Sequence, residues 1–437
     1  MKRPIGNYYI PSSAYVHIPF CRRRCYYCDF PISVVGDSKR GDNFSPIQEY
    51  VEVICEEINI TKSFDQPLET IFFGGGTPSL LSVSQLNRIL DALEQKFIIV
   101  ANAEISIEMD PGTFDLEQVR GYKSLGINRV SLGVQAFQDE LLKVCGRTHN
   151  VSDIYKAVDI LHQAGIVNFS IDLISGLPHQ TLEQWQTSLE AGIAISPTHI
   201  SSYDLVVEPV TAFGRYYQPG NHPLPTDETA AQMYRMAQQL ISISGYEHYE
   251  ISNYAKPDYQ CGHNRVYWEN RPYYGFGMGA ASYIAGERFT RPPTRKKYYQ
   301  WVQSIDRQYK LSLQDRSLKY QGIDTSNNYL ETNQECLLET LMLGFRLADG
   351  INLSTLSQHF GQQTAEQILI YLQPYQKLGW VELINPKGIV TLFSNNQKLP
   401  LEGYLRLTDP EGFLFSNTVL STLFSKLSNS ISMEYKI

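Results

Sequence analysis

The chain of 437 residues is 43% hydrophobic and 19% charged, which predicts a globular protein with a substantial core and two or three domains, and excludes a disordered chain. Its formal net charge of −8 argues against a general affinity for nucleic acid. No apolar run approaches the roughly 20 residues that span a bilayer, and the first residues lack the apolar stretch of a signal peptide, so we expect a cytoplasmic protein.

Six β-like runs alternate with amphipathic helices between residue 15 and about residue 206. The runs cover residues 15–18, 69–73, 104–109, 128–134, 168–174 and 199–207. The helices fall near residues 47–63, 84–97, 115–125, 138–162 and 181–195. Strand, helix and strand at this spacing imply right-handed crossovers and a parallel sheet. Six such units predict an α/β fold, a partial (β/α)6 TIM-like barrel that leaves one side open.

The chain changes character after residue 207. A helix is expected near residues 227–243, followed by a stretch rich in Tyr, Gly and Pro that predicts irregular loops and short strands over the open side of the barrel. From residue 331, helical segments precede two strands at 380–384 and 388–393 and a last helix near 415–427. This order predicts a C-terminal, mostly helical, winged-helix-like module. The expected divisions are a core (1–210), a covering segment (211–305), a linker or insertion (306–330) and the module (331–437).

A loop with three cysteines follows the first strand, in the sequence HIPFCRRRCYYCDF (residues 17–30). The chain holds seven cysteines, an odd number that predicts thiols rather than a disulfide framework. We expect small buried side chains at the four scattered ones, Cys55, Cys145, Cys261 and Cys336. Cys21, Cys25 and Cys28, in the spacing C-x3-C-x2-C, are too close together for random packing and indicate a metal site.

Three thiolates can hold three corners of a cubane iron–sulfur cluster and leave one iron free for another ligand. This interpretation accounts for the missing fourth cysteine, since Phe30 stands where another chain could place it. We expect Arg22, Arg23 and Arg24 to lower the pKa values of the thiols. The alternative is structural zinc, which prefers four ligands, and His17 could be the fourth although it precedes the loop on a strand.

Polar or flexible residues also follow the other strands, and binding sites in parallel sheets collect at these carboxyl ends. The glycines of GGGTPS (74–79) would let the backbone approach a small zwitterion, with the following helix start favouring its carboxylate. Taken alone, these glycines also suit a tight turn, and a Rossmann site is excluded because G-x-G-x-x-G is absent. The next strands carry Glu108 and Asp110, then Gln135, then Asp172.

Together these motifs resemble the radical S-adenosylmethionine (SAM) superfamily. The resemblance begins with the three cysteines, the aromatic Tyr27 beside the third, the preceding Tyr15, and GGGTPS. The segments YVHIPFC, SIEMDPGT, RVSLGVQAF and IDLISGLP are similar to the group that contains oxygen-independent coproporphyrinogen III dehydrogenases and HemW-type haem chaperones. The resemblance covers residues 15 to about 430 and implies a radical SAM barrel.

The resemblance implies roles at matching positions. Cys21, Cys25 and Cys28 would bind a four-iron, four-sulfur cluster whose free iron takes the amino and carboxylate groups of SAM. The residues implied to line SAM around its methionine part and adenine are Tyr15, Tyr27, Gly75, Gly76 and Thr77. Those implied to contact its carboxylate, ribose or nearby polar groups are Glu108, Gln135, Arg147 and Asp172, and Val206 is implied to contact the adenine.

Two features favour the HemW side of this group. The dehydrogenases usually carry a further cysteine two places after the third, where this chain has Phe30, and an N-terminal extension, where only fourteen residues precede Tyr15. The segment HNRVYW (263–268) matches the H-N-x-x-Y-W motif of the HemW-type chaperones. Histidine is a haem axial ligand, so the resemblance implies haem binding at His263, which would otherwise be read as a hydrogen-bonded loop histidine.

The expected function is therefore a haem chaperone that carries a cluster and SAM and delivers haem to apo-haemoproteins such as respiratory cytochromes. Peripheral association with membrane enzymes would suit this role. The alternative is an oxygen-independent coproporphyrinogen III dehydrogenase, in which a radical derived from SAM starts the oxidative decarboxylation of a porphyrinogen. The sequence leaves open whether SAM is cleaved, and so whether the protein is an enzyme.

Overall fold

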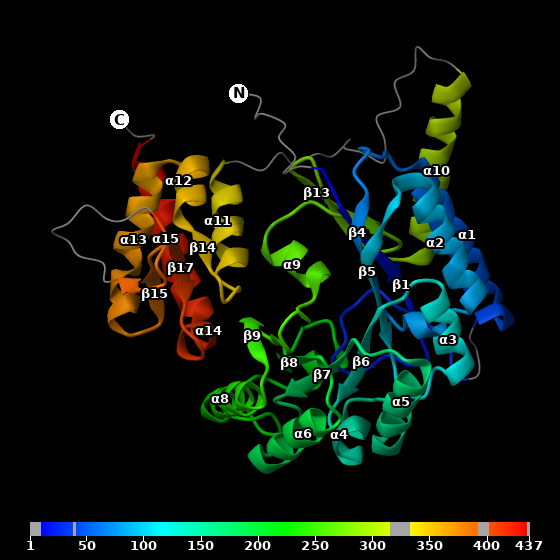
Figure 1. The fold of residues 1–437 in the computed structure, drawn as a ribbon, viewed down its shortest axis with the longest axis horizontal. Helices are drawn as coiled ribbons and strands as arrows, with labels where there is room; N and C mark the ends of the chain where they lie inside the picture. The colour runs from blue at the N-terminus through cyan, green and yellow to red at the C-terminus, as the bar shows by residue number, and fades with distance from the viewer. Residues whose placement is uncertain (1–9, 38–40, 315–332, 392–401, 435–437) are drawn as a thin grey trace. The chain divides into compact units, whose positions relative to one another are not determined.

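The computed structural model describes residues 10–37, 41–314, 333–391 and 402–434 (Figure 1). The chain divides into two compact units. The first contains residues 1–233, 261–266 and 271–330, and the second contains residues 234–260, 267–270 and 331–437. Within the described ranges, every helix is too short or too polar to cross a membrane.

The first unit is built on seven parallel strands in the order β11-β1-β4-β5-β6-β7-β8. Their bounds are β1 Ser13–Ile18, β4 Leu68–Gly75, β5 Ile99–Met109, β6 Arg129–Gln135, β7 Phe169–Ser175, β8 His199–Asp204 and β11 Tyr274–Phe276. The predicted partial barrel is confirmed. The seventh strand, β11, lies in the stretch expected to form irregular loops and short strands, and it pairs with the free edge of β1.

Helices cover the outer side of these strands (Figure 1). They are α1 Ser45–Ile60, α2 Val83–Phe97, α3 Leu116–Ser124, α4 Asp139–Val144, α5 Val151–Ala164 and α6 Leu182–Ala194. Capping boxes begin α2, α5 and α6, which explains why these helices start where polar residues interrupt the apolar pattern. The prediction of one helix over 138–162 is wrong, because Gly146 has a φ of 74° and Asn150 caps a new helix.

The last part of the first unit contains β12 Ala281–Ile284, β13 Glu287–Thr290 and α10 Arg295–Gln314. A fully buried ion pair between Arg291 and Glu57 (2.7 Å) fixes this part against α1. The same carboxylate accepts hydrogen bonds from Gly277 N (2.8 Å) and Tyr298 Oη (2.6 Å). The helix α10 extends into the predicted linker (306–330) as far as residue 314. Residues 315–330 lie outside the described residues.

Other helices are α7 Ala212–Tyr216, α8 Asp227–Ile243 and α9 Gly262–Trp268. In the second unit, the strands are β9 Glu247–Glu250, β10 Asn253–Ala255, β14 Ile351–Asn352, β15 Val381–Ile384, β16 Val390–Thr391 and β17 Tyr404–Leu407. Its helices include α11 Asn333–Gly344, α12 Leu353–Phe360, α13 Gln362–Lys377, α14 Glu411–Leu414 and α15 Ser416–Glu434. A mostly helical C-terminal region is confirmed. Its antiparallel sheet has four strands, β14-β17-β15-β16, where two were predicted.

Candidate functional site

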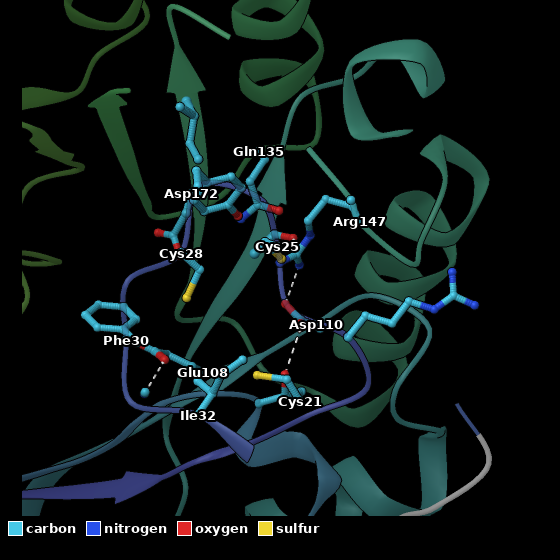
Figure 2. Close-up of a pocket in the computed structure, with 18 of the residues that line it drawn as sticks. Cys21, Cys25, Cys28, Phe30, Ile32, Glu108, Asp110, Gln135, Arg147 and Asp172 are labelled. Atoms are coloured by element: carbon cyan, nitrogen blue, oxygen red, sulfur yellow. Dashed lines mark hydrogen bonds and ion pairs between the residues drawn. The ribbon is translucent and has the colours of Figure 1, made fainter. Parts of the chain in front are cut away.

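A cavity of about 540 Å³ opens where the strands of the first unit end, and its walls carry nearly all the predicted site residues (Figure 2). The predicted residues that line it are Cys21, Cys25, Tyr27, Cys28, Gly75, Gly76, Thr77, Glu108, Gln135, Arg147, Asp172 and Val206. Two predicted residues, Tyr15 and His263, do not line it. The carboxyl ends of β4, β5, β6 and β7 therefore meet the cysteine loop at one place, as expected for a parallel sheet.

Cys21, Cys25 and Cys28 are half-buried free thiols that lie in the wall of this cavity. Two short strands, β2 Phe20–Cys21 and β3 Ser33–Val34, pair in parallel and hold the two ends of the cysteine loop together. Among the described residues, no three or more Cys, His, Asp or Glu side chains are arranged to hold a single metal ion. The thiols instead border a cavity that is large enough for a group of several atoms.

The arginines of the loop do not act on the thiols as expected. Arg22 and Arg24 donate to backbone carbonyl oxygens, and Arg23 pairs with an exposed aspartate. Burial raises the pKa of Cys21 and the pKa of Cys28, with Arg24 opposing the rise only at Cys28. The predicted lowering by an arginine is therefore found only for Arg24 at Cys28, and desolvation outweighs it there, so the net pKa still rises.

Arg147 contacts a sulfur atom of the cysteine loop directly. It lies in the break between α4 and α5, and its Nη1 atom is 3.3 Å from Cys25 Sγ. Its Nη2 atom forms an ion pair with Asp110 and donates to Gly133 O at 3.1 Å. Asp110 also accepts a hydrogen bond from Thr77 Oγ1 at 3.0 Å. The cysteine loop, the glycine loop and β5 are thus joined through one guanidinium and one carboxylate.

The glycine loop packs directly against the cysteine loop. Gly75 has a φ of 109°, and a Cβ atom there would lie 2.3 Å from the ring of His17. A Cβ atom on Gly76 would lie 2.7 Å from the backbone that leads into the cysteines. Gly75 N donates to Glu108 Oε2 at 2.8 Å. The helix start expected after the loop is a 3-10 helix (η3, Pro78–Leu80), and α2 follows it.

Two half-buried carboxyl groups, Glu108 and Asp172, and one buried amide, Gln135, face the cavity. Burial raises the pKa of Glu108 to about 8 and the pKa of Asp172 to about 6. Asp172 accepts a hydrogen bond from Ser131 Oγ at 3.0 Å. Gln135 lies at an irregularity in β6 with a φ of 65°, and its buried Oε1 atom has no hydrogen-bond partner in the described part of the chain. These groups can bind the ammonium, hydroxyl or amide groups of a polar ligand.

Several lining residues were missing from the predicted set. They include Phe30, Ile32, Ser131, Tyr203 and Asp204, whereas Asp110, which the strand-end rule did single out, lines the cavity as well. Tyr203 and Asp204 end β8, so the rule applied to the other strands would have found them. Phe30 and Ile32 leave the cysteine loop and carry no polar signal, so only the fold reveals that they face the cavity.

Tyr15 and His17 lie behind the glycine loop. Tyr15 Oη is 3.0 Å from His17 Nδ1, and His17 Nε2 is 2.9 Å from Pro31 O. Both ring nitrogens of His17 are therefore engaged within the protein, which excludes the idea that His17 completes a zinc site in this arrangement. Tyr15 can act on a ligand in the cavity only through neighbouring residues.

His263 lies elsewhere in the first unit and is fully buried. Its Nδ1 atom is 2.8 Å from Thr70 Oγ1, and its ring stacks on Phe72 with 5.3 Å between centroids. The backbone amides of Gly262 and His263 each donate to Glu104 at 3.0 Å. Burial lowers the pKa of His263 to about 3, so the imidazole is neutral. The role of His263 in haem binding stays a prediction.

Comparisons with known proteins agree with the resemblance. Residues 15–191 match the radical SAM superfamily model and residues 332–387 match the HemN C-terminal domain model. The chain is 47% identical over 97% of its length to a Synechocystis protein named heme chaperone HemW, covering 98% of that protein. It is 33% identical over 80% of its length to the Bacillus subtilis protein of the same name, covering 87% of it.

A solved structure titled as the Escherichia coli coproporphyrinogen III oxidase HemN, a radical SAM enzyme, has the same fold. Its TM-score is 0.74 at 23% identity, and the match covers 96% of this chain and 91% of that chain. At this identity the likeness supports the fold alone.

The lining of the cavity fits the iron–sulfur cluster and the SAM that the radical SAM superfamily implies. It offers three thiols for a four-iron, four-sulfur cluster. It also offers two buried polar atoms, Gln135 Oε1 and Arg147 Nε, that have no hydrogen-bond partner among the described residues, and a wall that two glycines keep open. On these matches, the chain belongs to the radical SAM superfamily and, within it, to the family of proteins named HemW.

Proposed function

We propose that this protein is a haem chaperone, which binds haem and delivers it to apo-haemoproteins such as respiratory cytochromes. The observation that carries the proposal is the 47% identity, over nearly the whole chain, to a protein named heme chaperone HemW. A cytoplasmic location and peripheral association with membrane enzymes that receive haem complete the proposal.

In this proposal Cys21, Cys25 and Cys28 would hold a four-iron, four-sulfur cluster. When bound, the cluster and SAM together supply one-electron chemistry. The protein's own part is to hold and orient. Arg147 sits against Cys25 and offsets negative charge there, while Gln135 offers a buried acceptor to SAM.

The other residues proposed to contact SAM divide by chemistry. Thr77 is held by Asp110 and so fixes the end of the glycine loop. Glu108, with a pKa raised to about 8, keeps its proton near neutral pH, whereas Asp172, with a pKa raised to about 6, is mostly ionised there. Tyr27 and Val206 supply apolar surface at the cavity wall, where the flat adenine would pack.

His263 is the proposed haem ligand. A neutral imidazole is the form that coordinates iron, and burial keeps His263 neutral. Because the ring is fully buried against Phe72, haem coordination requires the first turn of α9 to leave its hydrogen bonds to Glu104. Haem binding by this route is therefore coupled to a local opening of α9.

Titration with haem tests the proposal. We expect the wild-type protein to bind about one haem with a shifted Soret band, and His263→Ala to lose that spectral shift. His199 is also a buried histidine of the first unit, so His199→Ala is the matched control. Wild-type protein without haem affinity would refute the chaperone function, and unchanged coordination in His263→Ala would refute only the assigned ligand.

The second candidate is a coproporphyrinogen III dehydrogenase. The fold shared with the coproporphyrinogen III oxidase HemN is the observation that favours it. Anaerobic incubation of the reconstituted protein with SAM, a reductant and coproporphyrinogen III separates the two functions. We expect no protoporphyrinogen, and repeated turnover to that product would reverse the assignment.

A further inference from the structure

The side chain of His17 contacts three separate segments around the cavity. Its ring nitrogens lie 3.0 Å from Tyr15 Oη, on the same strand, and 2.9 Å from Pro31 O, on the arm that leaves the cysteine loop. The ring also fills the space beside Gly75, since a Cβ atom there would lie 2.3 Å from two of its atoms. His17 thus lies between the cysteine loop and the glycine loop.

The hydrogen bonds of His17 have fixed directions. A carbonyl oxygen can only accept, so Nε2 donates its proton to Pro31 O. Nδ1 then accepts from the hydroxyl group of Tyr15. Burial lowers the pKa of His17 to about 4, so this arrangement persists at neutral pH. The backbone is held as well, because Tyr50 Oη donates to the carbonyl oxygen of His17 at 2.7 Å.

Pro31 is the point at which His17 acts on the cavity. Its neighbours in the chain, Phe30 and Ile32, both line the cavity. On another side of Pro31 stands Gly279, where a Cβ atom would lie 2.3 Å from the proline ring. Pro31 is therefore held by a hydrogen bond and by close packing, and any shift of it moves two side chains of the cavity wall.

We propose that His17 is a positioning residue, which holds the outgoing arm of the cysteine loop against the glycine loop and thereby shapes the SAM-binding part of the cavity. It acts through Pro31 and Gly75, since it does not itself line the cavity. This inference rests on the proposed cluster and SAM site. Its consequence is that SAM binding depends on His17 more strongly than cluster binding does.

Three substitutions of His17 distinguish the contribution of its hydrogen bond to Pro31 from the contribution of its ring. In His17→Gln the amide nitrogen can take the place of Nε2, whereas in His17→Asn it can take only the place of Nδ1. His17→Phe keeps a ring and removes both hydrogen bonds. We expect Asn and Phe to weaken SAM affinity by about tenfold while iron content per chain stays at the wild-type value, and Gln to restore the affinity to within about threefold.

The measurements are iron content, SAM affinity, and the electron paramagnetic resonance spectrum of the reduced cluster with and without SAM. We expect the change of spectrum on adding SAM to persist in His17→Gln and to diminish in His17→Asn. His199→Phe replaces a buried histidine at the opposite end of the strands, and we expect it to leave both SAM affinity and spectrum unchanged.

Equal SAM affinity in His17→Gln and His17→Asn would overturn the proposal, as would wild-type affinity and spectrum in His17→Phe. If His17→Phe fails to keep iron, the comparison of Gln with Asn still decides, because both are polar and can be normalised to cluster content. Wild-type protein that takes up neither iron nor SAM would count against the proposed cofactor site instead.

Discussion

Arg147 connects the carboxylate of Asp110 with the thiol of Cys25 inside the cavity. Its side chain is only 8% exposed, so its charge interacts in a medium of low polarity. Removing Arg147 leaves the half-buried Asp110 carboxylate, 25% exposed, without its charge partner. The stability of the cluster-free protein and its ability to retain a cluster should therefore both depend on Arg147.

We expect Arg147→Ala to destabilise the protein by about 2–4 kcal/mol and to lower its iron content after reconstitution. Arg23→Ala is the matched control, because Arg23 forms a salt bridge at 63% side-chain exposure and should change stability by less than about 1 kcal/mol. Chemical unfolding of both variants measures the difference. Equal losses of unfolding free energy in Arg147→Ala and Arg23→Ala would show that the Arg147–Asp110 pair stabilises the protein no more than the exposed pair does.

The pKa of Glu108 predicts a pH dependence. Burial raises this pKa from 4.5 to about 8, so the folded chain holds the proton more tightly than the unfolded chain does. The resulting stability is fully present below about pH 4.5 and is lost as the pH rises through about 8. Asp172, with a raised pKa of about 6, changes stability in the same direction.

We expect the cluster-free protein to lose stability between about pH 5 and pH 8, and Glu108→Gln to remove part of this loss. Unfolding temperatures measured across a pH series test it. A parallel pH profile in the variant would mean that Glu108 titrates normally.

The sequence identified most single residues of the site, because strand ends and cysteine spacing are local signals. It could not predict which side chains pair with each other, because paired residues such as Arg147 and Asp110 are separated by 37 positions. Tyr15 illustrates the same limit: its hydroxyl bonds to His17 and its side chain stays outside the cavity wall. Neither fact follows from residue type.

At the scale of elements, the glycine loop after β4 depends on close backbone approach. Gly76→Ala would place its Cβ atom within 2.8 Å of backbone atoms that cannot yield. We expect it to weaken SAM binding by more than about tenfold, because the two loops must separate. Gly262→Ala meets its nearest atoms at 3.6 Å, so SAM affinity in this control should match the wild type. Comparable affinities in both variants would contradict the prediction.

The sequence placed six strands correctly because their apolar runs are long and bounded by turns. Two features could not be predicted from apolar runs: the break between α4 and α5, and the pairing of β11 with β1. The break between α4 and α5 depends on Gly146 and Asn150, which interrupt an otherwise continuous apolar pattern. The strand β11 covers only Tyr274–Phe276, and its identity comes from pairing with β1 rather than from its own residues.

At the scale of the whole molecule, the two units contain separate buried cores. All residues that line the cavity at the strand ends belong to the first unit. The second unit has its own apolar cluster, which includes Leu341, Phe345, Leu383 and Leu405. A ligand that binds one unit stabilises that unit by mass action.

We therefore expect two calorimetric transitions on heating, of which only one moves upward when the protein carries the cluster and saturating SAM. Cluster-loaded protein without SAM provides the reference. A single transition that shifts as a whole would show that both units unfold together.

The pairing of β1 with β11 has a consequence for synthesis of the chain. The amide and carbonyl groups on that edge of β1 find their partner only when Tyr274 has left the ribosome, some 250 residues later. At a synthesis rate of about 5–20 residues per second this delay lasts on the order of tens of seconds. During that time the edge of β1 remains unpaired next to three cysteines that have no ligand yet. Early covering of this edge should therefore decide what fraction of the newly made protein aggregates.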